Sequence, residues 1–276
     1  MFPKAYKFKS LAARQRRSRL YNHLHFAEFS ENIDEFIDKI KGISKRDLRK
    51  IESRTVAQAK CTDWFYYRKN LITSTLTIRV VRAIERGAVD YYINESIRKR
   101  NDYTLYYPPI VYGRKFEKTG LLAFVKKFKK CHDNVTVSNH GLKIEEETRI
   151  LAGSIDLMIN CSCCGTFIVE LKCSWKLRDS LIPDWTSLDY ITSDGELNKK
   201  HQYMYQIQTY LGIYKIKRGL FVVWTPQDIL IIEIPFDEVL YDRIKKCSET
   251  YYFKYYMPIE YPELYENLDS EMPLLL

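Results

Sequence analysis

Apolar side chains between residues 27 and 100 recur every three or four positions. Two runs with this spacing are Phe29, Ile33, Phe36, Ile40 and Leu76, Val80, Val81, Ile84. Such spacing lines up one face of an α-helix, so we predict that this segment is mainly helical. A Pro-Pro pair at 108–109 interrupts the pattern, and a further helix is predicted from about Gly113 to Lys130.

From Thr148 onward the apolar segments become short and partly β-branched. Segments 150–159 and 166–173 flank the sequence Cys-Ser-Cys-Cys-Gly, which predicts a β-hairpin with a five-residue loop at 161–165. The same patterns predict the elements that follow, namely a helix at about 200–215, strands at 220–224 and 229–234, and a helix at about 237–253. We therefore expect an α/β fold with an N-terminal helical layer.

The chain contains no internal repeat and no clear linker. We predict a basic arm over residues 1–20 and a single domain over 21–276, which ends in an acidic tail from about 258. Of the 276 residues, 46% are hydrophobic and 29% are charged, which suits a buried core and excludes a disordered or collagen-like chain. No window reaches the roughly 18 apolar residues that a membrane span needs, so we expect a soluble protein without a membrane partner.

Basic residues exceed acidic ones by nine, which favours a polyanionic partner such as nucleic acid. The first 20 residues carry no acid and contain an arginine cluster, Arg14, Arg16, Arg17 and Arg19. This arm either binds phosphates or is simply solvated. It also fits a disordered tail, a nuclear import signal or a mitochondrial presequence. We expect an intracellular protein of the nucleus or cytoplasm, with the mitochondrion as the alternative.

The seven cysteines are an odd number, and three of them crowd into 161–164, which favours a reduced compartment over a disulfide-linked exterior. Cys161, Cys163, Cys164 and Cys173 raise the question of zinc. Structural zinc sites commonly use pairs of cysteines two to four residues apart, and the hairpin tip has no second pair at that distance. We therefore expect free thiols here.

The predicted hairpin also brings charged residues together. If its strands pair symmetrically about the loop, Asp156 stands opposite Glu170, with Cβ atoms roughly 4.5–5.5 Å apart. Lys172, two residues beyond Glu170, projects from the same face. Carboxylate oxygens suit hard cations such as Mg²⁺, and an ammonium group beside them can orient a water molecule. The alternative is a plain salt bridge of Lys172 on a solvated face.

These residues resemble the D…(D/E)-x-K core of the restriction-endonuclease-like nucleases. Beyond that core, the chain resembles the YqaJ-like viral recombinase family, relatives of phage lambda exonuclease, over about residues 55–257. The blocks that carry the resemblance, in the order of the family, are Trp64–Lys69 with Ile72–Thr75, Tyr112–Glu117, Gly153–Asp156, Glu170–Lys172, His201–Gln208 and Phe221–Pro226. The resemblance implies a mixed central β-sheet flanked by helices.

The resemblance also implies roles for individual residues. Asp156 and Glu170, helped by the Leu171 carbonyl and by Glu117 from a helix, would bind one or two Mg²⁺ or Mn²⁺ ions. Lys172 and Gln206 would position the attacking water, and Arg68 and Thr75 would hold a phosphate, in the exonucleases the 5′-terminal one. The expected activity is a 5′→3′ exonuclease on double-stranded DNA ends, in recombination, end processing or DNA degradation, and related exonucleases form homo-oligomeric rings.

Several alternatives stay open. The chain could bind nucleic acid without turnover, or act as an RNase or an endonuclease on the same scaffold, because such a site reads a phosphate and not a base. Arg68 and Thr75 are seven residues apart, about two turns of a continuous helix. A helix break near Asn70 would bring them together differently.

Overall fold

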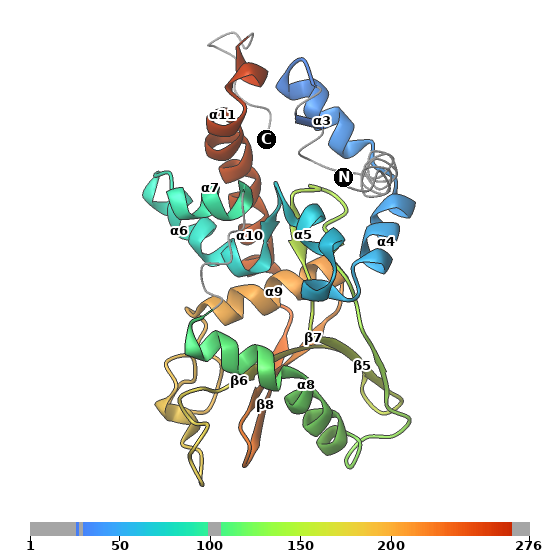
Figure 1. Cartoon of the computed structure of the whole chain (residues 1–276), viewed down its shortest axis with the longest axis vertical. Helices are drawn as coiled ribbons and strands as arrows, with labels where there is room; N and C mark the ends of the chain where they lie inside the picture. The colour runs from blue at the N-terminus through green and yellow to red at the C-terminus, as the bar shows by residue number, and fades with distance from the viewer. Residues whose placement is uncertain (1–25, 28–29, 99–105, 267–276) are drawn as a thin grey trace, which may run out of the picture.

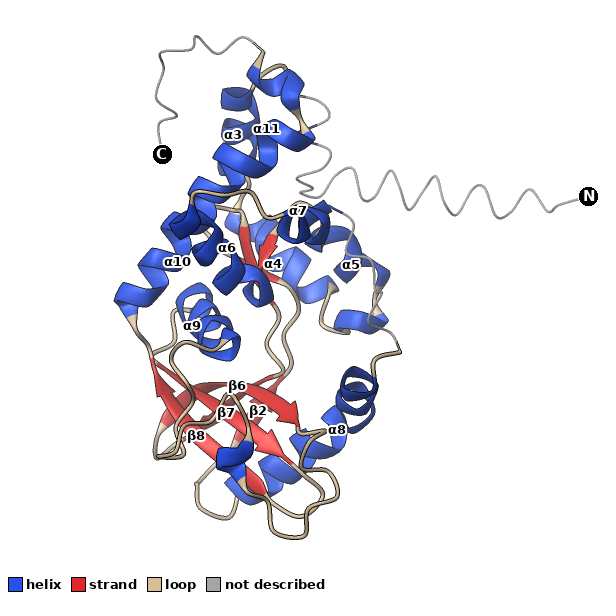
Figure 2. Ribbon diagram, turned by 90° about the vertical axis from the view of Figure 1, so that its left-hand side faces the viewer, coloured by secondary structure: helices blue, strands red, loops and turns tan. Residues whose placement is uncertain are grey.

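The structure is a computed structural model that describes residues 26–27, 30–98 and 106–266. Figures 1 and 2 show most helices gathered at one end of the molecule and the larger β-sheet, with one long helix beside it, at the other. The α-helices of eight or more residues are α3 (Ile33–Lys41), α4 (Lys45–Arg54), α6 (Thr77–Arg86), α7 (Tyr91–Arg98), α8 (Pro108–Phe128), α9 (Gln202–Tyr214) and α10 (Glu238–Tyr251). The shorter ones are α5 (Thr62–Arg68) and α11 (Met257–Glu260).

The N-terminal helical layer is formed as the apolar spacing predicts. Helix α3 buries Ile33, Phe36 and Ile40, and it begins at Asn32, whose side chain accepts a hydrogen bond from the Glu35 N–H. This is the usual way to satisfy a free N–H at a helix start. Phe29, which continues this spacing, lies outside the described residues.

Helix α8 begins earlier than the sequence predicted. The Pro-Pro pair forms its first two residues instead of separating it from the preceding chain. Proline has no N–H to donate, and the first turn of a helix does not need that donor, so prolines are well tolerated there. The extra turn carries α8 toward the end of the sheet, alongside β6 in Figure 1.

The larger sheet has the strand order β2-β5-β6-β7-β8. Its strands are β2 (Thr136–Ser138), β5 (Leu157–Cys161), β6 (Gly165–Cys173), β7 (Arg218–Trp224) and β8 (Ile229–Pro235). Only the β6–β7 pair is parallel in this sheet, and α9 connects these two strands. A smaller sheet has the order β1-β4-β3, with β1 (Ile72–Thr73), β3 (Lys143–Ile144) and β4 (Leu151–Gly153).

The predicted hairpin register is confirmed, and its details are corrected. Leu157 pairs with Val169, as symmetric pairing requires, but Cys161 also pairs with Gly165, so three residues rather than five form the loop. The single strand expected over 150–159 is wrong. It is split into β4 and β5, which belong to different sheets, and residues 154–156 cross between them.

The two faces of the larger sheet pack against different helices. Val169 and Leu171 of β6 belong to the apolar cluster that includes Phe124 of α8, whereas Ile168 packs in the other cluster with Ile207 of α9. Alternation along a strand therefore directs Glu170 and Lys172 toward the α9 side.

Within the described residues, no helix combines the length and the apolar character that a membrane crossing requires.

Candidate active site

The structure brings Asp156, Glu170 and Lys172 together at the point where the β5–β6 ladder opens. Asp156 directly precedes β5, and its Oδ2 accepts a hydrogen bond of 2.7 Å from the Leu171 N–H of β6. Glu170 is buried, with 2% of its surface exposed, and its Oε1 lies 2.5 Å from Nζ of Lys172. The predicted clustering of these three side chains is therefore present.

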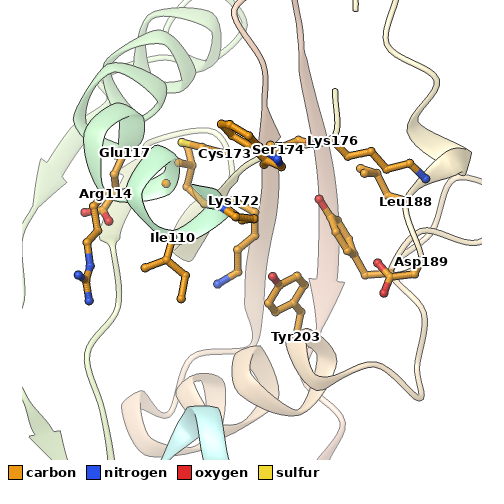
Figure 3. A pocket seen from close by; sticks show the side chains of 15 residues that line it. Ile110, Arg114, Glu117, Lys172, Cys173, Ser174, Lys176, Leu188, Asp189 and Tyr203 are labelled. Carbon is orange, nitrogen blue, oxygen red and sulfur yellow. The ribbon is translucent and has the colours of Figure 1, made fainter. Parts of the chain in front are cut away.

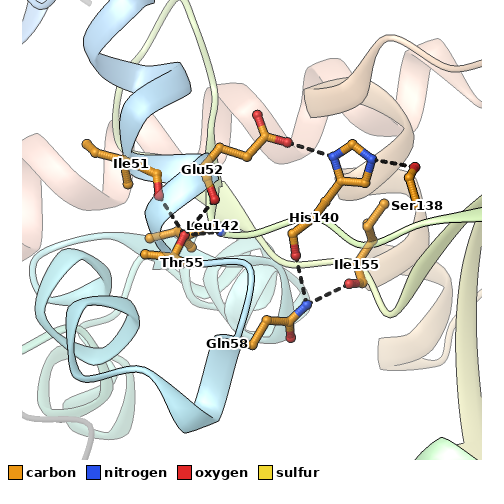
Figure 4. Close-up of polar contacts among 8 residues, drawn as sticks. All are labelled: Ile51, Glu52, Thr55, Gln58, Ser138, His140, Leu142 and Ile155. Atoms are coloured by element: carbon orange, nitrogen blue, oxygen red, sulfur yellow. Dashed lines mark hydrogen bonds and ion pairs between the residues drawn. The ribbon is translucent and has the colours of Figure 1, made fainter.

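The segment that presents Asp156 is held by the N-terminal helical layer. Nε2 of Gln58 donates to the carbonyl oxygens of Ile155 and His140, at 2.8 and 3.1 Å (Figure 4). The indole N–H of Trp64 donates to Oγ of Ser154 at 2.8 Å. These contacts take the place of a continued strand, so the chain turns here and its next residue, Asp156, reaches β6.

Gln206 connects α9 to this cluster. Its Nε2 donates to Oε1 of Glu170 and to the Tyr210 hydroxyl, both at 2.8 Å, and its Oε1 lies 3.5 Å from Nζ of Lys172. The other oxygen of Glu170, Oε2, is buried and has no hydrogen-bond partner among the described residues. A buried carboxylate oxygen normally has a partner, so Oε2 is a position where a cation fits.

Burial, followed by repulsion between carboxylates, determines the electrostatics of the site. Burial, together with the nearby Glu170 and Glu117 carboxylates, raises the pKa of Asp156 well above its ordinary value, although Lys172 and the Leu171 N–H oppose this. Glu117 of α8 reaches solvent, but desolvation and the Glu170 charge still raise its pKa. Both groups would lose their negative charge less readily beside a divalent cation.

Lys172 stays protonated in this environment. Burial alone would lower its pKa, but the Glu170 carboxylate, Tyr203 and Asp156 outweigh that effect and raise the pKa above its ordinary value. Its ammonium also lies 4.4 Å from the centre of the Tyr203 ring, a cation–π distance. The site therefore keeps one fixed positive charge beside its carboxylates.

These residues fit a divalent metal ion. The unpartnered Oε2 of Glu170, the adjacent Asp156 carboxylate and the solvent-facing Glu117 are hard oxygen donors of the kind that Mg²⁺ or Mn²⁺ prefers. Within the part of the chain that the structure describes, the three carboxylates do not form a group whose ligand atoms all lie within 4.8 Å of one another. Binding one ion with all three would therefore require side-chain movement.

A cavity of about 460 Å³ opens beside these groups. It is lined by the first half of α8, including Glu117, by the end of β6, by the loops at 174–176 and 188–190, and by Tyr203. Figure 3 shows Lys172 between Glu117 on one side and Tyr203 on the other. The cavity gives an extended ligand access to the charged cluster from solvent.

For Arg68 and Thr75, the structure has the helix break and not the continuous helix. Helix α5 ends at Arg68, and Asn70 has the left-handed φ of 57°, after which β1 begins. The Arg68 guanidinium lies over the Trp64 ring at 3.8 Å from its centre, and Thr75 is exposed. Nε of Arg68 is buried without a hydrogen-bond partner in the described residues, and burial lowers the pKa of the side chain to about 10.

Tyr210 and Tyr203 are site residues that the sequence reading missed. Tyr210 follows Gln206 by four residues and Tyr203 precedes it by three, so all three lie on one face of α9. That spacing is a signal from which both could have been found.

The arginine cluster Arg14, Arg16, Arg17 and Arg19 lies outside the described residues, and its role remains a prediction. The individual roles of the site residues also remain predictions.

A mixed sheet with Asp156 before one strand and Glu170-Leu171-Lys172 on the next is the arrangement of the PD-(D/E)XK nuclease fold. Residues 63–216, more than half of the chain, match the YqaJ-like viral recombinase domain, and the chain belongs to this family. No curated protein sequence matches the chain.

Several solved structures share the fold. An alkaline exonuclease from Laribacter hongkongensis, LHK-Exo, superposes with a TM-score of 0.52 at 15% identity, over 73% of this chain and 95% of the exonuclease. A complex of SOX with DNA gives 0.56 at 11% identity, over 79% and 72% of the chains. A complex of SOX from KSHV with RNA gives 0.58 at 10% identity, over 84% and 79%. The predicted family, the fold and the nuclease class of enzyme are thus confirmed.

Proposed function

We propose that this nuclease is a divalent-metal-dependent DNA exonuclease that degrades DNA from 5′ ends, in recombination, end processing or DNA degradation. One observation carries the proposal. The buried Glu170 has one oxygen held by Lys172 and Gln206 and the other without a partner, next to the Asp156 carboxylate. In a buried salt bridge without a metal ion, the second carboxylate oxygen would normally have a hydrogen-bond partner as well.

Asp156, Glu170 and Glu117, with the Leu171 carbonyl, would hold Mg²⁺ or Mn²⁺. Such an ion, when bound, supplies a water of lowered pKa and neutralises charge on the phosphate. The protein contributes an ammonium group, because Glu170 and Gln206 hold Lys172 Nζ in place. This ammonium would orient that water and attract the phosphate. Gln206 in turn fixes the Glu170 carboxylate.

DNA is proposed as the substrate class because the family is one of recombinases, although SOX has been solved with both DNA and RNA. The preference for a 5′ end rests on Arg68. A guanidinium that lies over the Trp64 ring with Nε unsatisfied is suited to donate to a terminal phosphate through its planar fork. Thr75, the exposed residue of the turn after β1, would add a hydroxyl donor.

The experiment is a time course on matched substrates with Mg²⁺ and without added metal. Linear duplex with 5′-phosphate is expected to be digested fastest, 5′-hydroxyl duplex more slowly, and covalently closed circles and RNA very slowly. Rapid cutting of circles would identify an endonuclease, and faster cutting of RNA would identify an RNase. Binding without cutting of any substrate would identify a nucleic-acid-binding protein that does not turn over.

A further inference from the structure

Four side chains with soft metal-binding atoms meet at the tip of the β5–β6 hairpin. They are His132, from the turn after α8, and Cys161, Cys163 and Cys164 of the hairpin. Nδ1 of His132 lies 3.3, 3.7 and 3.6 Å from the sulfurs of Cys163, Cys161 and Cys164. The sulfur of Cys163 lies 3.5 Å from that of Cys161 and 3.7 Å from that of Cys164.

These spacings are those of ligands that share one tetrahedral ion. With Zn–S bonds of about 2.3 Å and a Zn–N bond of about 2.0–2.1 Å, tetrahedral angles put two sulfurs about 3.8 Å apart and sulfur and nitrogen about 3.5 Å apart. We propose that His132, Cys161, Cys163 and Cys164 bind one zinc ion. Three thiolates and one imidazole form a recurrent structural zinc set, and soft sulfur ligands select zinc over Mg²⁺.

The surroundings orient the ligands without the metal. The His132 ring stacks on Phe128 with 3.8 Å between ring centres and 9° between planes, which fixes the direction of Nδ1. The Asp133 carbonyl accepts a 3.0 Å hydrogen bond from the Ser162 N–H, so the turn and the hairpin tip are already joined. The Arg218 guanidinium donates to the Cys164 carbonyl and brings a positive charge toward the thiolates.

The site would be structural rather than catalytic. Three sulfurs and one nitrogen fill all four positions of a tetrahedral zinc, which leaves none for water or substrate. The ion would join the end of α8 to the β5–β6 hairpin. Because α8 carries Glu117 and β6 carries Glu170 and Lys172, this link would help to fix the distance between the two elements that line the active-site cavity.

The zinc proposal departs from the prediction of free thiols, because the sequence argument considered cysteines alone. Its objection was that Cys161, Cys163 and Cys164 have no second pair nearby in the chain. The fourth ligand is instead a histidine 29 residues before Cys161, which only the packing of α8 against the sheet brings to the hairpin tip.

The first test is the zinc content of the purified full-length protein, measured by elemental mass spectrometry after dialysis without chelator. One zinc per chain is expected for the wild type. Cys163→Ser and His132→Asn should each weaken zinc binding at least about tenfold, since even partners outside the ligand shell contribute 10- to 100-fold. Cys131→Ser, which changes an exposed cysteine next to His132 but outside the cluster, should keep one zinc, as should Glu170→Gln.

The second test replaces zinc with Co²⁺ and records the visible spectrum. Intense d–d bands of tetrahedral cobalt with a thiolate charge-transfer band are expected, and they should weaken in Cys163→Ser while persisting in Cys131→Ser. Wild-type protein that folds, holds no zinc, gives no such spectrum and has all three hairpin thiols free to react would overturn the proposal. So would a Cys163→Ser variant that retains full zinc content and the unchanged spectrum.

Discussion

Nε2 of Gln206 lies 2.8 Å from Oε1 of Glu170, so a helix on one side of the sheet determines which oxygen of the buried carboxylate stays without a partner. The same amide nitrogen donates to the Tyr210 hydroxyl one turn later on α9. The amide thus cannot rotate without losing both contacts. This arrangement makes Gln206 a positioning residue for the metal-binding carboxylate.

Replacing Gln206 with alanine is expected to lower kcat by about 10- to 100-fold, because a small misplacement of a reacting group has effects of this size. The KM for DNA should change much less, since Gln206 is buried and does not line the cavity. Steady-state kinetics on 5′-phosphorylated duplex measure both. Gln202→Ala, an exposed glutamine at the start of α9, is the matched control and should behave as wild type. An equal effect of the two substitutions would remove the positioning role.

Arg68→Met is expected to abolish the preference for 5′-phosphorylated over 5′-hydroxyl ends while leaving slow metal-dependent cutting. The methionine keeps apolar contact with Trp64 but removes the planar fork that would bind the phosphate. The measurement is the ratio of initial rates on the two substrates. Arg86→Met, an exposed arginine at the end of α6, serves as the control. A preference that survives in Arg68→Met would exclude Arg68 as the end-binding residue.

Asp156→Asn should raise the melting temperature of the protein without added Mg²⁺ by a few degrees at neutral pH. Burial and the Glu170 and Glu117 charges raise the folded-state pKa of Asp156 above its unfolded value of about 4. The folded state then binds the proton more tightly, so stability falls as pH rises through this range. Asparagine removes the charge and keeps an acceptor for the Leu171 N–H.

Thermal unfolding between pH 4 and 8 tests this. The gain of Asp156→Asn should shrink toward pH 4, and added Mg²⁺ should stabilise the wild type more than the variant. Asp228→Asn is a control of opposite sign, because a hydrogen bond from the Ile229 N–H and the nearby Lys127 lower the pKa of Asp228. A loss of stability in Asp156→Asn at every pH would show that the negative charge of Asp156 does not destabilise the folded protein.

Removing the basic arm, residues 1–20, should flatten the salt dependence of DNA binding. Each phosphate that a protein neutralises contributes about 0.9 to the log–log slope on duplex DNA. The slope is best measured with Glu170→Gln protein, which should bind without cutting. Deletion of 267–276, which removes only acidic and uncharged residues, should leave the slope at least as steep. An unchanged slope after removal of the arm would favour a targeting role for it.

The hairpin that carries the site was predictable because its determinants are local. Two short apolar segments around a compact loop fix the pairing of Leu157 with Val169, and with it the approach of Asp156 to Glu170. The helical spacing of the N-terminal layer is equally local. The family resemblance added Glu117 and Gln206, which no local pattern connects to the hairpin.

What the sequence did not reveal depends on contacts between distant segments. The split between β4 and β5 depends on Gln58 and Trp64, about 90 or more residues earlier, which hold the crossing segment at 154–155. The meeting of His132 with the hairpin cysteines depends on how α8 packs on the sheet. Neither contact leaves a periodic signal in the chain.

The central claim is that Glu170, together with Asp156 and Lys172, supports metal-dependent phosphodiester hydrolysis. Its most direct test is the initial rate on 5′-phosphorylated linear duplex with Mg²⁺ for wild type, Glu170→Gln and, as a control, Glu233→Gln, an exposed acid on β8. Loss of a metal ligand should slow cutting by roughly 10³-fold or more, with Glu233→Gln unaffected. A Glu170→Gln protein that cuts DNA as fast as the wild type would contradict the account.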